Sequence, residues 1–221
     1  MRSLIAFAAL LCAVPAQATD HDGQLWTTAT AEFELADGVD FSGQFVARFS
    51  DAADGVSELQ YQADVSWEAR PGLTLDVGYS YVPRYSGGDL TTREHRVRQQ
   101  ASLRLGEVLG GRVEGRVRLE QRWRDDGDDT MLRLRTRLAW TRPIGPNDLA
   151  VRVWHETFMH LNDTDWGGEA RWARARNQLS LRRKFGSSIT GEVGYLNQYD
   201  VARGREDQIA HALTLSLTQA F

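Results

Sequence analysis

Hydrophobic and polar residues alternate with a period of two along most of the chain. Between residues 58 and 69 the odd positions are apolar or aromatic, whereas the even positions are polar or charged. A strand places successive side chains on opposite faces, whereas a helix has a period of 3.6 residues and does not sort them in this way. The same alternation returns at residues 73–81, 112–124 and 132–140. The pattern predicts an all-β protein.

Reading the whole chain in this way gives eleven candidate strands. They lie near residues 24–35, 40–49, 57–69, 73–82, 92–105, 111–124, 130–142, 148–160, 170–185, 188–200 and 207–221. A strand of a soluble protein typically has about five or six residues, whereas a tilted strand that crosses a bilayer needs roughly 9 to 11. Most of the candidates are at least that long, which favours a membrane barrel.

The connections alternate between short turns and longer polar segments. The short set comprises residues 70–72, 143–147 and 186–187; the longer set comprises 50–56, 83–90, 125–129, 161–168 and 201–206. Outer-membrane barrels have short periplasmic turns and longer external loops. We therefore expect the longer connections to face the outside of the cell.

The location of the two termini limits the number of strands. Both termini of a bacterial one-chain barrel normally lie in the periplasm, which requires an even number of strands. Ten remain if residues 19–38 lie in the lumen or only lead into the barrel, and twelve result if one strand escaped the pattern. We therefore expect an antiparallel, up-and-down transmembrane β-barrel of 10 or 12 strands.

A soluble barrel of the lipocalin kind also alternates, with its apolar residues inside and its charges in water. Strand length, a C-terminal aromatic residue and aromatic residues near strand ends favour lipid instead. These aromatic residues are Trp67, Tyr79, Tyr81, Trp123 and Trp140.

The N-terminus has the features of a secretory signal peptide. Arg2 supplies a positive charge, the segment from Leu4 to Val14 is almost wholly apolar, and Ala16-Gln17-Ala18 is a small-x-small cleavage site. We expect residues 1–18 to be cleaved and residues 19–221 to form one barrel domain in the outer membrane of a Gram-negative bacterium. Because Cys12 lies in the signal segment, no disulfide is expected in the mature chain.

The C-terminal residue, Phe221, has the same parity as Leu213, Leu215 and Leu217. A terminal aromatic that closes an amphipathic strand resembles the assembly signal of outer-membrane barrels. The expected partners are therefore outer-membrane lipid and the barrel assembly machinery.

The charge balance bears on partners and on the interior. The chain has 26 basic and 30 acidic residues and a net charge of −4, which argues against nucleic acid as a partner. Every basic residue except Lys184 is arginine. Guanidinium groups keep their charge when partly buried and form forked bonds with carboxylates, so this bias suits a crowded charged interior. A GC-rich genome explains it equally well.

In a membrane barrel the charged parity faces the lumen. The expected lumen-lining residues are Glu58, Asp64, Glu68, Asp76, Glu94, Arg96, Arg98, Arg116, Arg118, Glu120, Arg122, Arg133, Arg135, Arg137, Arg152, Glu156, Arg174 and Arg176. The early strands are acidic and the middle strands basic, so we expect arginines to reach across a narrow barrel to the acidic wall and to constrict the lumen. The alternative is a charged network that only packs the interior.

Several short motifs resemble a bacterial family of unknown function, DUF2490. They are Glu94-His95-Arg96, Arg118-Leu119-Glu120-Gln121-Arg122, Arg133-Leu134-Arg135, Glu156-Thr157-Phe158 and Gly194-Tyr195-Leu196, in this order. The resemblance implies an outer-membrane barrel and supplies no activity.

Signals for chemistry are weak. His155 lies near an external rim with the hydroxyl of Thr157 two residues later, which makes His155 a weak candidate for the base of a lipid-modifying hydrolase. The acidic segment 125–129 lacks the ligand spacing of a calcium loop. We expect no metal and no cofactor.

The expected function is a narrow, porin-like channel or a structural envelope protein with a lumen filled by arginine and glutamate. The transported ion or small molecule is left open. A rim-located lipid-modifying hydrolase and a binding protein built from the surface loops are the alternatives.

Overall fold

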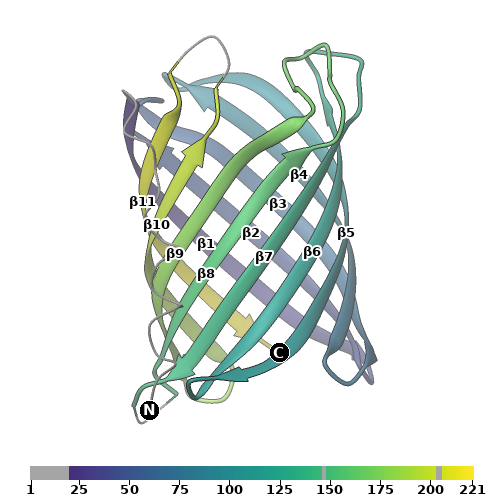
Figure 1. Cartoon of the computed structure of the whole chain (residues 1–221), viewed down its shortest axis with the longest axis vertical. Coiled ribbons are helices and arrows are strands. Elements are labelled where there is room, and N and C mark those ends of the chain that lie inside the picture. Colours follow the sequence, from purple (N-terminus) through teal and green to yellow (C-terminus); the bar gives the residue numbers. More distant parts are fainter. Residues whose placement is uncertain (1–19, 146–147, 203–205) are drawn as a thin grey trace, which may run out of the picture.

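The computed structural model describes residues 20–145, 148–202 and 206–221, and its strands close into a barrel (Figure 1). The expected signal peptide, residues 1–18, lies outside the described residues. The strands are β1 (Asp20–Ala36), β2 (Val39–Ser50), β3 (Gly55–Arg70), β4 (Leu73–Ser86), β5 (Asp89–Val108), β6 (Gly111–Arg124), β7 (Met131–Pro143), β8 (Ala150–His160), β9 (Arg171–Phe185), β10 (Ile189–Asp200) and β11 (Gln208–Ala220). Each corresponds to one of the eleven ranges expected from the alternation.

The strand number corrects the expectation of 10 or 12. Neighbouring strands pair antiparallel around the barrel, except that β1 pairs in parallel with β11. An odd number of alternating strands leaves the first and the last running in the same direction, and a parallel pair is then the way to close the ring. β1 is therefore a full wall strand, and the idea that residues 19–38 lie in the lumen is wrong.

The two ends of the barrel differ in their connections (Figure 1). At one end, called the turn end, the strands are joined by short turns such as Asp37-Gly38 and Pro71-Gly72, whose glycines have φ of +72° and +81°. At the other, called the loop end, the longer connections 125–130 and 161–170 lie next to each other. Asp20, the first described residue, lies at the loop end, because β1 enters the barrel there.

The outer face of the barrel is apolar. Side chains that are at least two-fifths exposed include Phe45, Tyr61, Val65, Val77, Val117, Leu138, Leu179, Leu181, Val193, Leu213, Leu215 and Leu217, which come from strands all around the ring. Trp123 and Trp172 lie toward the loop end, and Trp67 lies toward the turn end. The described residues include no helix that is long and apolar enough to cross a membrane.

The C-terminal residue contacts β1 at the turn end, where the parallel pair of β1 and β11 closes the barrel; we call this pair the seam. The backbone N–H of Phe221 donates to the carbonyl of Glu32, 2.9 Å away. The Phe221 ring stacks on Phe33 of β1, with 4.8 Å between ring centroids. Phe221, expected as an assembly signal, therefore contacts the first strand across the closure of the barrel.

Candidate functional site: the lumen

The structure places the lumen-lining set on the inside of the barrel. All but three of the expected residues line a central cavity of about 560 Å³; Glu94 and Arg122 are buried beside it, and Glu68 lines a second cavity at the turn end. Thirteen arginines and seven carboxylates line the central cavity. The lining is thus markedly cationic, although the chain as a whole is acidic.

The lumen is filled on the side of the loop end. We call this filling the loop-end plug; its residues are each at most 6% exposed and comprise Val82, Glu94, Arg96, Glu120, Arg122, Met131, Arg133, Phe158 and Leu196. They sit in the halves of their strands that lead to the longer connections.

Glu94 is the first centre of the plug. Its carboxylate is fully buried and accepts hydrogen bonds from Arg96 Nε at 2.7 Å and Arg122 Nη2 at 2.9 Å. The register explains this arrangement, since Arg96 on β5 lies directly opposite Arg122 on β6. Two facing guanidinium groups repel, and one carboxylate between them relieves the repulsion.

Glu120 and Glu156 extend the same arrangement around the ring. Glu120 accepts from Arg133 Nε and Arg135 Nη1, each at 2.7 Å. Arg135 also donates to Glu156 Oε2 at 2.9 Å, and Arg116 pairs with the same carboxylate. Each carboxylate thus joins two arginines from different positions, and because Arg135 pairs with both Glu120 and Glu156, these ion pairs connect β6, β7 and β8.

Phe158 forms an apolar hub inside this network. Its ring is 1% exposed and is surrounded by the guanidinium groups of Arg133, Arg135, Arg174 and Arg176 at 4.5–5.7 Å from the centroid. A cation over the face of a ring is attracted by its quadrupole, so the ring holds together arginines that repel one another.

Trp26 plays a similar part on β1. The guanidinium groups of Arg48 and Arg176 lie 3.9 Å and 4.8 Å from its ring centroid. These two arginines come from β2 and β9, which are not neighbours in the ring. Trp26 therefore bridges the lumen rather than facing lipid.

The expected pairing between an acidic and a basic wall is only partly right. Asp64 on β3 does reach Arg98 on β5, at 2.7 Å, across Gly78 of the intervening strand. A Cβ at Gly78 would lie 1.9 Å from Asp64 Oδ1, so only glycine leaves room for this pair.

Among the other acidic residues of the early strands, only Glu58 comes within ion-pair distance of a middle-strand arginine in the described ranges, with its Oε2 3.9 Å from Arg96 Nη2. Glu58 pairs with Arg48 at 2.6 Å and Arg84 at 2.9 Å, which lie on its neighbouring strands β2 and β4. Glu68 accepts from the backbone N–H of Gly72 at 3.2 Å, and Asp76 accepts from Gln100 at 3.0 Å. The expectation that the early acids neutralise the arginines of β6 and β7 is therefore wrong; Glu120 and Glu156, inside the basic wall, do so.

The sequence did not lead us to the apolar residues of the central cavity, nor to some of its charged ones. The apolar residues are Trp26, Val46, Trp154, Phe158 and Leu196, and the charged ones include Arg48, Arg84 and Glu192. The alternation along each strand could have revealed the apolar ones, because they occupy the same odd or even positions as charged residues that line the cavity. Phe158 and Trp154 share the parity of Glu156 and Arg152, which were assigned to the lumen, but as apolar residues they were not considered for an interior of charges.

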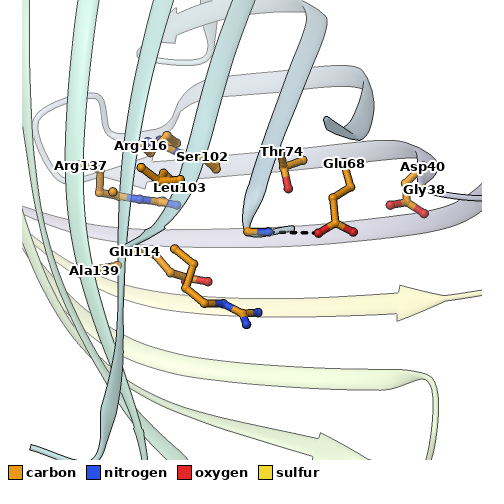
Figure 2. Close-up of a pocket in the computed structure, with 13 residues that line it drawn as sticks. Gly38, Asp40, Glu68, Thr74, Ser102, Leu103, Glu114, Arg116, Arg137 and Ala139 are labelled. Carbon is orange, nitrogen blue, oxygen red and sulfur yellow. Dashed lines mark hydrogen bonds between the residues drawn. The ribbon is translucent and has the colours of Figure 1, made fainter. Parts of the chain in front are cut away.

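A second cavity, of about 430 Å³, opens the lumen at the turn end; we call it the turn-end vestibule. In Figure 2, Arg116 and Arg137 lie at one side of it, and Asp40 and Glu68 lie at the other. Arg116 and Arg137 also line the central cavity. The two cavities therefore meet at these two arginines, and the vestibule leads to the inner part of the lumen.

His155 does not have the contacts of a hydrolase base. Its side chain is exposed on the outer face, with Nδ1 2.8 Å from Asn177 Oδ1. The hydroxyl of Thr157 lies 2.7 Å from that of Thr136 instead. His155 and Thr157, which suggested a rim hydrolase, thus each contact a different residue and not one another.

The acidic segment 125–129 is folded onto the neighbouring loop. The carboxylate of Asp165 accepts the backbone N–H groups of Asp128 and Asp129 at 2.8 Å and 3.2 Å. These bonds hold the pKa of Asp165 below its usual range, the N–H of Asp128 having the largest effect. The acids here serve as loop caps, and the described part of the chain contains no group of ligands suited to a metal ion.

Comparisons with known proteins find a family, a relative and a solved structure to which the chain is similar. The model of a family described as a protein of unknown function (DUF2490) matches residues 23–209. An uncharacterized protein of Methylorubrum extorquens is 34% identical over 217 residues, which span 97% of this chain and 92% of the relative. The solved structure of LpxR from Salmonella typhimurium is similar in fold, with a TM-score of 0.50 and 10% identity over 81% of this chain and 83% of that one.

Proposed function

The chain belongs to the DUF2490 family, and we propose that it is an outer-membrane β-barrel that forms a narrow, constricted channel rather than an open general porin. The observation on which this proposal depends is the loop-end plug, in which Glu94, Glu120 and Phe158 are at most 1% exposed inside the barrel. Side chains that are this buried narrow the path for water and solutes at the loop end.

The outer face supports the location in a membrane. Its exposed apolar side chains come from every part of the ring and form a belt, whereas soluble monomers rarely expose contiguous apolar patches beyond a few hundred Å². Aromatic residues lie toward both ends of that belt, as they do in barrels of the bacterial outer membrane. We place the turn end in the periplasm, because such barrels have short periplasmic turns.

The lining supports selectivity for anions. With thirteen arginines against seven carboxylates, any ion that passes the constriction meets a surplus of positive charge. A ring of arginines in a narrow pore favours anions and excludes cations.

Planar-bilayer recording tests this proposal. The wild type is expected to give rare, small current steps, whereas Phe158→Ala removes the hub of the plug and should give larger, anion-selective ones. Phe185→Ala changes an exposed aromatic on the outer face and serves as the matched control. A wide, always open wild-type pore would contradict the constriction, and a folded Phe158→Ala variant without current would favour a purely structural role.

A further inference from the structure

Four arginines line the part of the central cavity next to the turn-end vestibule, and two of them, Arg116 and Arg137, line the vestibule as well. Arg116 on β6 lies directly opposite Arg137 on β7, and Arg118 lies two residues along the same face of β6. Arg152 of β8 is opposite Thr141 of β7, on the same side of the sheet as Arg137. Like charges in such positions repel, so this group needs a counter-charge to be stable. We call it the arginine quartet.

The protein supplies too little of that counter-charge. Arg116 shares Glu156 with Arg135. Arg118 donates to the neutral Gln100 at 2.8 Å and lies 3.8 Å from Glu120, a carboxylate that already holds two other arginines.

The remaining two arginines are still less compensated. Arg152 lies 3.9 Å from Glu192, at the limit of an ion pair. Arg137 lies over the Trp154 ring at 5.8 Å, and within the described ranges no hydrogen bond or ion pair joins it to a carboxylate. Glu156 lies directly opposite Arg137 on β8 and attracts it, but this carboxylate is already paired with Arg116 and Arg135, and the nearby Arg152 and Arg118 repel Arg137. The four arginines thus share three carboxylates, Glu156, Glu120 and Glu192, and the first two also pair with Arg135, so the quartet keeps a surplus of positive charge.

The quartet contains hydrogen-bond donors that are not used. The Arg116 side chain is nine-tenths buried, yet its Nε has no hydrogen-bond partner among the described residues. Arg152, which is 17% exposed, also has an unpaired Nε, as do Arg48 and Arg98 elsewhere in the lumen. Buried N–H groups are nearly always paired, so the unpaired donors of the quartet are available to an acceptor that enters the cavity.

A ligand can reach the quartet from the turn end. Arg116 and Arg137 line both cavities, whose volumes of about 430 and 560 Å³ are within the usual range for small-molecule sites. Figure 2 shows the two side chains at the wall of the vestibule, on the opposite side from Asp40 and Glu68. Asp40 and Glu68 repel an anion, so the side of the vestibule that Arg116 and Arg137 form is the more favourable for it.

We propose that the arginine quartet is a binding site for a small oxyanion with two negative charges, of the class of phosphate and phosphate monoesters, that enters from the turn end. A phosphate group has about −1.5 to −2 charges near neutral pH and three acceptor oxygens, which match the surplus charge and the free donors. Guanidinium forks bind such oxygens two at a time. This inference deepens the proposed function by naming what the lumen binds, and it rests on the barrel architecture of that proposal.

Titration calorimetry on the full-length folded barrel in a zwitterionic detergent tests it, with inorganic phosphate and glycerol phosphate as probes at constant ionic strength. The wild type is expected to bind both with one site per barrel, and to bind chloride and acetate at least tenfold more weakly. Arg137→Gln should weaken phosphate binding tenfold or more, since it removes the least compensated guanidinium. Arg183→Gln removes the same charge from the exposed part of β9 and should leave the affinity unchanged.

Folding of each variant is checked by the shift in gel mobility on boiling. Equal phosphate affinity in the wild type and a folded Arg137→Gln variant would overturn the site, as would equal weakening by Arg183→Gln. Binding is measured without any current, so its failure is distinct from failure of the channel. An open wild-type pore that still binds phosphate would contradict only the constriction.

Discussion

The two halves of the lumen are built from the same arginine-rich strands, yet one is closed and the other open. In the loop-end half, Glu94 and Glu120 each join two arginines at 2.7–2.9 Å, and Phe158 fills the centre. In the turn-end half, Arg137 and Arg152 face a cavity with carboxylates that are distant or shared. The positions of Glu94, Glu120 and Phe158 therefore decide which part of the arginine-rich wall is packed and which part faces an open cavity.

The largest expected effect follows from breaking the plug. Glu120→Gln leaves Arg133 and Arg135 with less counter-charge in a buried place, where loss of one partner typically costs about 3–5 kcal/mol. Glu192→Gln removes a single ion pair, 3.9 Å from Arg152, and keeps an oxygen to which Ser180 donates, so it should cost only about 1 kcal/mol. Urea unfolding in lipid vesicles measures both values. Equal losses would show that the two halves are not energetically different.

A smaller loss is expected at Gly78. Gly78→Ala places a Cβ against Asp64 and pushes it away from Arg98, which should cost about 1–3 kcal/mol, as overpacking usually does. Gly43→Ala is the matched control, because a Cβ there has no atom within 4 Å and adds only strand preference. The same unfolding assay applies, and a Gly78→Ala variant as stable as Gly43→Ala would contradict the crossing of Asp64 over β4.

The seam at Phe221 should show a milder effect on stability. Phe221→Ala removes the stack on Phe33, and such aromatic pairs contribute about 0.5–1.5 kcal/mol. The expected result is slower formation of the heat-modifiable form in refolding assays, because the last strand is held less firmly to the first. Phe185→Ala, an aromatic at the same end but away from the seam, should assemble at the wild-type rate. Identical rates for both variants would remove the seam from the account.

The smallest effect concerns the docked loops. The depressed pKa of Asp165 means that its bonds to Asp128 and Asp129 stabilise the loop pair above the usual carboxyl range and are lost as the pH falls through the folded value. The NMR amide shifts of Asp128 and Asp129 should therefore move together on acidification. In Asp165→Asn, which does not titrate, this common movement should be absent. Its persistence there would assign it to another group.

Much of the fold could be predicted from the sequence, because a period of two is a local property that a single strand displays. The same alternation along each strand predicts that Glu120, Arg133 and Arg135 face the lumen. The parallel closure of β1 on β11 could not be predicted, since it joins residues nearly two hundred positions apart and leaves no periodic trace. An even strand count was a rule about other barrels, and this ring of eleven breaks it.

The choice of ion-pair partners was equally out of reach. Which carboxylate meets which guanidinium depends on strand register and on side-chain length, as the pair from Asp64 to Arg98 across Gly78 shows. Phe158 was not predicted to line the lumen because an apolar residue at a position where the strand otherwise carries charges looks like an interruption of the alternation. In the structure that interruption is the centre of the plug.

The central claim, that the lumen is closed at the loop end and open at the turn end, is tested most directly by side-specific thiol labelling. In a Cys12→Ser background, Ser216→Cys places a thiol in the central cavity and Ser80→Cys places one at a position that is 1% exposed. A membrane-impermeant thiol reagent should label Ser216→Cys in permeabilised cells, where the turn end is accessible, and not in intact cells; Ser80→Cys should stay protected in both. Equal labelling of Ser216→Cys in intact cells would contradict the claim.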